Sequence, residues 1–297
     1  KLLDCFSVFA SVSIERSRLK DRAKFGQVEF EMKTWITDKE RSMKGQIPTK
    51  LLIPMDKLSN ILMVKFDAPE WDGIGHFKVI FAIFDIFDLM NFFNITNEKL
   101  FRFLFEIRNT YNKVPYHNWR HAVDVTQFTT FQILAGGLDT ILTKFEIFGI
   151  LISAVCHDAD HDGFTNIYNV KAETPLGILF KNQSVMETHH CSVAINIITK
   201  DECNIFSSLS SADNKNMWTL IINLILSTDM AKHFDILKEF NSIFDEGKFS
   251  MDNQSDRLLL LKLLLKSSDI SNVARPFELA DKWCDVLCEE FFRQGDL

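Results

Sequence analysis

An apolar helix that runs directly into a cluster of charged side chains constrains this fold most. The segment Lys144–Cys156 is strongly apolar and continues without a break into His157-Asp158-Ala159-Asp160-His161-Asp162. Five ionisable side chains at the end of a buried helix cost free energy unless something binds them. A surface loop rich in Asp is the alternative, which the preceding apolar residues disfavour. An EF-hand loop does not fit, because no alternating Asp/Asn series ends in a Glu.

The rest of the chain predicts further helices and no convincing alternating strand or internal repeat. Its 297 residues include only 6 Pro and 11 Gly, which disfavours an all-β fold with its frequent turns. The fold class is therefore all-α, a compact multi-helix bundle. Beyond Lys144–Cys156, helices are expected over His76–Phe93, Thr96–Tyr111, His117 to about Leu134, His189–Thr199, Lys215–Phe244, Arg257–Lys266 and Phe277–Arg293.

Residues 1–60 differ from the remainder in carrying mixed charges and a turn near Gly45–Pro48. We expect a linker helix and loop there, joined to an upstream regulatory or membrane region, and one domain over residues 61–297. Because the chain starts at Lys1 and not at Met, we expect a fragment. The most apolar stretch, Val79–Ile95, contains Asp85 and Asp88, which favours a core helix over a membrane span.

Net charge and cysteine usage limit the partners and the compartment. The net charge is −7, from 33 basic and 40 acidic residues, and no basic cluster suited to a nucleic-acid groove is visible. No nucleic-acid partner is therefore expected. Without a CxxC pair or a disulfide framework, the cysteines indicate a reducing, cytoplasmic-facing location, with membrane attachment of a parent protein left open. They are Cys5, Cys156, Cys191, Cys203, Cys284 and Cys288.

Four side chains from three separate segments could together hold metal. His117 and His121 would share one helix face, which alone is a weak signal. Asp269 follows the apolar helix Leu258–Leu265, and in isolation it would be interpreted as a helix cap. The combination of His121, His157, Asp158 and Asp269 offers two imidazoles and two carboxylates, which suit Zn²⁺.

The second oxygen of Asp158 could bridge to a harder ion such as Mg²⁺ or Mn²⁺. Two metals roughly 3.5–4 Å apart can hold a hydroxide and clamp both oxygens of an in-line displacement at phosphorus.

An ordered series of motifs resembles the class I 3′,5′-cyclic-nucleotide phosphodiesterase catalytic domain over roughly residues 74–297, closest to its high-affinity cGMP-specific branch. The motifs are Tyr116-His117-Asn118-x-x-His121-Ala122, His157-Asp158-x-Asp160-His161 with Gly163 and Asn166, Ser184-Val185-Met186-Glu187-x-His189-His190, Ser227-Thr228-Asp229-Met230-Ala231-Lys232-His233, Asp269-Ile270-Ser271-Asn272, and Glu289-Glu290-Phe291-Phe292-Arg293-Gln294-Gly295-Asp296. The resemblance implies an HD-type phosphohydrolase fold with a binuclear metal site.

The resemblance also implies the reaction and its residues. A cyclic nucleotide would be hydrolysed to the 5′-monophosphate by a metal-bridged hydroxide. His117 would protonate the leaving 3′-oxygen as general acid, with Glu290 positioning it. The tight Zn²⁺ would be held by His121, His157, Asp158 and Asp269, with Asp158 also reaching Mg²⁺ or Mn²⁺ at the second site. Water-orienting groups would be His161, Glu187 and Thr228, and the pocket would be bordered by Tyr116, Met230 and Asn272.

Without the motifs, Glu187 would be interpreted as a surface helix charge, and Thr228 as a helix residue bonded to its own backbone.

The substrate is less constrained by these residues than the chemistry is. The segments Glu202–Ser207 and Asp269–Pro276 look most like the cGMP-specific branch, so cGMP is favoured, with cAMP or dual use left open. The family's purine-binding glutamine and phenylalanine clamp would lie beyond Leu297, so we expect the fragment to lack one wall of the pocket. Val273 stands where the family often has Pro.

Two other functions compete with this interpretation. A different HD-type metal phosphohydrolase would share the ligand set but would not need His117 or the Glu187 and Thr228 segments. A non-catalytic nucleotide-sensing module would be expected to have lost a ligand or the acid, and none is lost. The N-terminal segment could join a regulatory domain or contribute to a homodimer, and the sequence does not choose between these.

Overall fold

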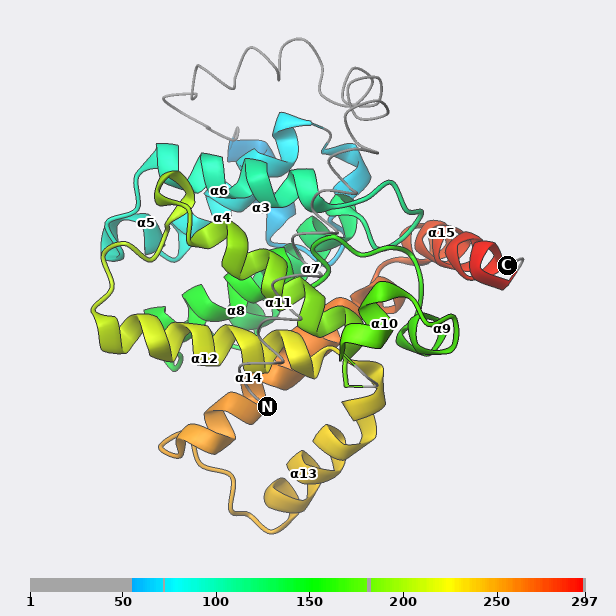
Figure 1. Ribbon diagram of the computed structural model, residues 1–297. Coiled ribbons are helices and arrows are strands. Elements are labelled where there is room, and N and C mark those ends of the chain that lie inside the picture. Colours follow the sequence, from blue (N-terminus) through cyan, green and yellow to red (C-terminus); the bar gives the residue numbers. More distant parts are fainter. Residues whose placement is uncertain (1–54, 72, 181–182, 296–297) are drawn as a thin grey trace. The chain divides into compact units, whose positions relative to one another are not determined.

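The computed structural model describes residues 55–71, 73–180 and 183–295, which form helices and contain no β-strand (Figure 1). The all-α prediction is therefore confirmed for these residues. The prediction of a linker helix and loop within residues 1–60 falls almost entirely outside them. The described residues divide into a smaller unit, 166–185 without 181 and 182, and a larger unit that contains the others.

The helices follow one another with short connections. The first half of the chain contains α3 (Met55–Ile61), η1 (Ala68–Glu70), α4 (Ile74–Ile86), α5 (Leu89–Phe92), α6 (Asn97–Thr110), α7 (Trp119–Ala135), η2 (Leu138–Thr140) and α8 (Lys144–Cys156). The second half contains α9 (Asn166–Lys171), α10 (Pro175–Phe180), α11 (Val185–Ile198), η3 (Asp201–Cys203), α12 (Ser211–Ser227), η4 (Met230–Lys232), α13 (His233–Asp245), α14 (Gln254–Asp269), η5 (Ser271–Ala274) and α15 (Phe277–Gly295).

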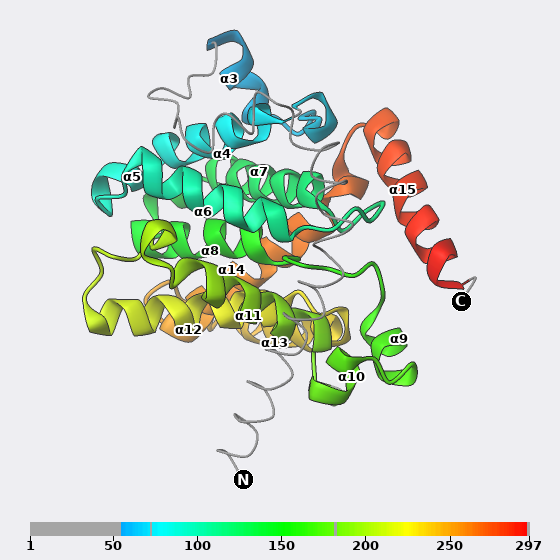
Figure 2. The same ribbon diagram turned by 45° about the horizontal axis from the view of Figure 1, so that its top comes forward.

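Helix α8 lies at the centre of the larger unit. It packs against α7, α12 and α14, and α7 in turn packs against α4 and α14 (Figure 2). Every residue from Ile147 to Cys156 is buried, because the apolar sequence leaves no polar face for solvent. At Gly149 a Cβ atom would lie 2.4 Å from Leu220 Cδ2, so glycine permits the close approach of α8 and α12.

The N-terminus of α8 is fixed to α14 by one glutamate. Thr143 and Glu146 form a capping box, in which each side chain bonds the other residue's backbone N–H. Glu146 also accepts hydrogen bonds from Arg257 Nε (2.6 Å) and Nη2 (2.5 Å) at the start of α14. A cap that is local in sequence therefore also sets where α14 lies beside α8.

Two segments expected as continuous helices are broken, and these predictions were wrong. His76–Phe93 divides into α4 and α5 at Asp88, whose left-handed backbone (φ 52°) is incompatible with a helix. Lys215–Phe244 divides into α12 and α13 after Ser227, where side chains take over the last carbonyls of α12. The apolar segment around α4 is a core helix as predicted, with Val79, Ile80 and Ile83 fully buried.

The smaller unit is a pair of short helices, α9 and α10, that pack against each other. Gly177 on α10 meets the backbone of Asn169, because a Cβ there would lie 2.0 Å from the Asn169 carbonyl oxygen. Thr174 donates to Asn169 Oδ1 (2.6 Å) between the two helices. Glycine at position 177 is thus a requirement of this contact.

The cysteines of the described residues are unpaired, as expected. Cys156, Cys191 and Cys203 are buried in the helices, whereas Cys284 is exposed and Cys288 is half-buried on α15. No helix in the described part of the chain is both long enough and apolar enough to cross a bilayer.

Candidate functional site

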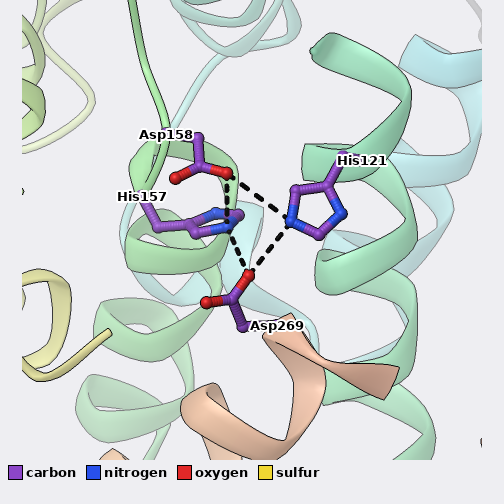
Figure 3. Close-up of side chains that lie close together, drawn as sticks. All are labelled: His121, His157, Asp158 and Asp269. Atoms are coloured by element: carbon purple, nitrogen blue, oxygen red, sulfur yellow. Dashed lines mark hydrogen bonds and ion pairs between the residues drawn. The ribbon is translucent and has the colours of Figure 1, made fainter. Parts of the chain in front are cut away.

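The four predicted metal ligands meet at the ends of three helices that pack together. His121 is in the first turn of α7, His157 and Asp158 follow α8, and Asp269 is the last residue of α14 (Figure 3). One ligand atom from each lies within 4.8 Å of all the others. His121 Nε2 is 3.0 Å from Asp269 Oδ1 and 3.5 Å from Asp158 Oδ2. His157 Nε2 is 3.1 Å from Asp158 Oδ2 and 3.2 Å from Asp269 Oδ1.

The chemistry of this cluster fits a divalent cation. His157 Nδ1 lies 2.8 Å from the Ala154 carbonyl, which can only accept, so Nδ1 carries the proton and Nε2 presents a lone pair. That lone pair faces two carboxylate oxygens, an arrangement that is repulsive unless a cation or a proton lies between them. Asp158 Oδ2 is buried and receives no hydrogen bond from the described residues. Imidazole nitrogen with carboxylate oxygen is a ligand set of Zn²⁺.

The cluster strongly perturbs the pKa values of its members. Burial alone lowers the pKa of His157, but Asp158 and Asp269 raise it well above its ordinary value. Burial raises the pKa of Asp158, but His157 lowers it well below its usual range. The pKa of Asp269 is likewise lowered, because His157 and His121 outweigh its burial. In the absence of metal, shared protons therefore have to balance these buried carboxylates.

A second group of possible ligands shares Asp158 with the first. Its members are Asp158, His161 and His190, and all three are buried. His190 Nδ1 donates to the Ala159 carbonyl (2.6 Å), and its Nε2 lies 3.8 Å from Asp158 Oδ1. Burial lowers the pKa of His190 to about 4, so its Nε2 is an unprotonated acceptor at neutral pH. Asp158 is therefore placed between the two groups, one carboxylate oxygen toward each.

Sequence reasoning gave His190 no role. The pair His189-His190 offers two adjacent imidazoles, and their spacing does not say which one faces the centre. In the structure His189 Nε2 pairs instead with Asp160 Oδ2 at 2.9 Å.

His117 lies outside α7, so the prediction that it shares a helix face with His121 was wrong. Helix α7 begins at Trp119 because the Asn118 side chain accepts hydrogen bonds from the backbone of Arg120 (2.9 Å) and His121 (3.4 Å). The two rings are still near each other, with centroids 5.9 Å apart. Because α7 starts only after Asn118, His117 lies outside the helix, where its ring contacts Glu290 on α15.

Glu290 on α15 holds His117 by both its ring and its backbone. Its carboxylate accepts hydrogen bonds from the backbone N–H groups of Tyr116 (2.8 Å) and His117 (3.1 Å), and it forms a short hydrogen bond with His117 Nδ1. Burial lowers the pKa of His117, but Glu290 raises it above its ordinary value. With Nδ1 engaged, Nε2 remains as the nitrogen that can deliver a proton.

His161 stacks on His117 and differs from it in charge. The ring centroids are 4.1 Å apart and the planes differ by 11°. Gly163 N–H donates to His161 Nδ1 (2.9 Å), which leaves Nε2 as the protonated nitrogen of the neutral ring. Burial and the charge of His117 lower the pKa of His161 well below its ordinary value. The pKa of His117, the predicted acid, is thus raised, whereas the pKa of its neighbour His161 is lowered.

The predicted pocket residues lie in different surroundings. Tyr116 donates to Asn272 Oδ1 (2.5 Å), and Asn272 Nδ2 is buried with no hydrogen-bond partner among the described residues. Met230, in η4, is 57% exposed.

Glu187 belongs to none of the groups of His, Cys, Asp and Glu side chains that could hold a metal among the described residues. Glu187 is half-buried in the first turn of α11. Thr228 is buried at the C-terminus of α12, where its hydroxyl donates to the Ile225 carbonyl (2.8 Å).

Comparisons with known proteins agree with the resemblance found in the sequence. The family model described as 3′5′-cyclic nucleotide phosphodiesterase matches residues 116–297. A high-affinity cGMP-specific 3′,5′-cyclic phosphodiesterase 9A of Drosophila melanogaster is 37% identical over 77% of this chain, and the Homo sapiens protein of that name is 33% identical over 87%. The crystal structure of the phosphodiesterase domain of Salpingoeca rosetta rhodopsin phosphodiesterase superposes with a TM-score of 0.78 at 32% identity, covering 83% of this chain and 76% of that one.

These curated relatives are much longer than the matched region. The chain spans 15% of the Drosophila protein and 44% of the human protein. The similarity therefore concerns one part of each relative.

Proposed function

Because this chain belongs to the 3′,5′-cyclic nucleotide phosphodiesterase family, we propose that it hydrolyses a cyclic nucleotide, cGMP in preference to cAMP, to the 5′-monophosphate. The observation that carries the proposal is the juxtaposition of two ligand groups, buried except for the half-buried Asp269, with a histidine held by a glutamate. Support for cGMP comes from the relatives, whose names describe them as cGMP-specific.

Residues 61–297 would form the catalytic domain, with residues 1–60 linking it to a regulatory region or contributing to a homodimer.

The two ligand groups would bind different metal ions. His121, His157, Asp158 and Asp269 would hold Zn²⁺, for which two imidazoles and two carboxylates are a usual set. Asp158 would also reach a second ion, Mg²⁺ or Mn²⁺, beside His161 and His190; Mg²⁺ keeps several waters and needs few protein ligands. Divalent ions bound there would lower the pKa of water and neutralise charge on the phosphate.

The side chains around the centre would move and orient protons. A water oxygen would bond to phosphorus and release a proton to solvent while the P–O3′ bond breaks, and His117 would give its Nε2 proton to the departing O3′. The Glu290 carboxylate would fix that ring and stabilise its charged form. Neutral His161, the Thr228 hydroxyl and the Glu187 carboxylate would orient water by hydrogen bonds. Asn272, oriented by Tyr116, would donate to the base, and Met230 would border the pocket.

Hydrolysis of cGMP and cAMP, measured side by side on the full-length protein with Mg²⁺ and with chelator, tests the proposal. We expect chelator-sensitive turnover, faster with cGMP, that falls by roughly 10²-fold or more in His117→Ala through loss of the proton donor. Asp269→Ala should abolish turnover together with bound metal. Asp285→Ala, an exposed carboxylate on α15, is the matched control and should retain activity.

The same assay distinguishes the two competing functions, another HD-type phosphohydrolase and a non-catalytic nucleotide-sensing module. Metal-bound protein that turns over neither cyclic nucleotide would overturn the proposal. Turnover of a different phosphoester would then favour another HD-type phosphohydrolase, and binding of cyclic nucleotide without turnover would favour a sensing module.

A further inference from the structure

Side chains reach every carbonyl in the last turn of α12, and the backbone N–H of Thr228 also donates to the Ile225 carbonyl (3.1 Å). The last four carbonyls of a helix have no partner within the helix. Here each accepts a hydrogen bond from a side chain: Leu224 from Ser227 Oγ (2.6 Å), Ile225 from Thr228 Oγ1 (2.8 Å), Leu226 from Lys232 Nζ (2.9 Å) and Ser227 from Lys266 Nζ (2.9 Å). Three of the four donors are local in sequence, and Lys266 comes from α14.

Lys266 is a buried cation, with 5% of its surface exposed. A lysine is rarely buried unless its charge is compensated. Its Nζ donates to the Ser227 carbonyl and lies 3.4 Å from the Asp229 carbonyl, so it contacts the backbone on both sides of Thr228. The negative end of the α12 dipole adds to this compensation.

The surroundings of Lys266 include acidic groups of the candidate centre. Burial lowers the pKa of Lys266, whereas Asp269, Asp229 and Glu187 raise it, and burial prevails. Lys266 lies three residues before Asp269 on α14, so the two side chains share a face of that helix. The same helix thus carries a predicted metal ligand and the lysine that bonds the backbone on either side of Thr228.

The Thr228 hydroxyl can make further hydrogen bonds only as an acceptor. Its proton is engaged by the Ile225 carbonyl, so toward any other group the oxygen can only accept. Its position depends on the backbone around it, and Lys266 holds that backbone at the carbonyl just before Thr228 and at the carbonyl of the next residue, Asp229. A shift of that backbone would move the one acceptor that Thr228 has to offer.

We propose that Lys266 is a positioning residue that holds the Thr228 hydroxyl in register with Asp269, so that its oxygen accepts a hydrogen bond from water at the second metal position. This inference rests on the proposed function, because it assumes a metal centre there. Lys266 acts through Thr228 and touches neither metal nor substrate.

The test is the affinity of the full-length protein for Mn²⁺, measured by electron paramagnetic resonance with Zn²⁺ already bound. Lys266→Met should weaken Mn²⁺ binding by roughly 10-fold or more, the usual effect of losing a group that orients a metal's surroundings. Lys266→Arg should restore much of the affinity, because a guanidinium can donate to both carbonyls. Lys232→Met is the matched control: it uncaps the neighbouring Leu226 carbonyl of the same helix end and should leave Mn²⁺ affinity unchanged.

A double-mutant cycle separates positioning from general destabilisation. If Lys266 acts through Thr228, then Lys266→Met combined with Thr228→Ala should bind Mn²⁺ no more weakly than Thr228→Ala alone. Additive losses, or wild-type affinity in Lys266→Met, would overturn the inference. Should Lys266→Met fail to fold, Lys266→Gln and Lys266→Arg carry the same comparison. Turnover by the wild type is recorded separately, so failure of the proposed function is distinguished from failure of this inference.

Discussion

At the scale of single residues, Glu290 joins the His117 ring to the backbone that carries it. One buried carboxylate accepts hydrogen bonds from two consecutive backbone amides and from the His117 ring. Its own pKa is lowered below the ordinary value because the hydrogen bonds and charge of His117 outweigh the effect of burial. Glu290 therefore stays ionised at neutral pH and favours the protonated form of His117.

Replacing Glu290 tests this coupling. In Glu290→Gln the His117 pKa should fall, because the charge that raises it is removed. The alkaline limb of the pH profile of kcat/KM, where His117 loses its proton, should then move to lower pH. The rate at pH 7 should fall by about 10²-fold, the low end of what a general acid contributes.

Glu289→Gln is the control for this prediction. Glu289 is exposed and pairs only one turn along the helix with Arg293, so its loss should move neither the rate nor the pH profile. An unshifted alkaline limb in Glu290→Gln would show that His117 is not the titrating acid.

The juxtaposition of His121, His157, Asp158 and Asp269 could be predicted from the sequence, but the partner of His117 could not be derived from spacing. His157, Asp158 and Asp269 each end a strongly apolar helix, which is a local signal of buried charge. Glu290 lies 173 residues from His117, and only the family resemblance connected the two. His190 stayed unassigned because which of two adjacent imidazoles faces inward depends on how α11 packs.

At the scale of elements, a fully buried ion pair fixes the connection between α14 and α15. Arg275 Nη2 lies 2.9 Å from Asp124 Oδ1 on α7, and neither side chain is exposed. The guanidinium also donates to the Val64 carbonyl (3.1 Å) and lies over the Phe128 ring, 4.9 Å from its centroid. Arg275 therefore ties η5, which carries Asn272, to the helix that carries His121.

Breaking this ion pair should cost stability. Arg275→Met leaves the Asp124 charge buried without a partner, so the free energy of unfolding should fall by about 3 kcal/mol or more. Urea unfolding followed by circular dichroism measures the change. Arg293→Met, which breaks an exposed pair with Glu289, is the control and should change stability by under about 0.5 kcal/mol. An equally small effect in Arg275→Met would show that the pair is not a clamp.

Some helix boundaries could be predicted from local sequence signals, and others could not. Thr96 and the residues after it indicated α6, and the structure confirms Thr96 as its N-cap. The end of α12 could not be predicted, because a lysine from α14 caps it. The break at Asp88 was also missed, since a left-handed aspartate has no strong signature in a single sequence.

At the scale of the whole molecule, the candidate metal centre joins helices from distant parts of the chain. The N-terminus of α7 and the C-termini of α8 and α14 all contribute a ligand. A cation that binds only the folded chain stabilises all three helix ends at once. Bound metal should therefore contribute to global stability as well as to chemistry.

Metal removal tests this contribution. Calorimetry of protein treated with chelator should give a lower Tm than with Zn²⁺ restored. At a free metal concentration 100 times Kd, linkage gives about 2.7 kcal/mol, or a shift of roughly 5–10 °C for a domain of this size. Asp269→Asn should abolish the difference. A Tm that does not respond to metal in the wild type would contradict a centre built from these ligands.

The long separation between His117 and Glu290 has a consequence for how the molecule forms. A contact that closes a loop of 173 residues is entropically costly, and it forms late in folding and late in synthesis. His121, His157 and Asp158 can assemble before α15 has left the ribosome, but the pairing of Glu290 with His117 cannot. The His117–Glu290 pair should therefore be the last part of the candidate site to be completed, so a nascent chain would assemble most of its candidate metal ligands before that pair could form.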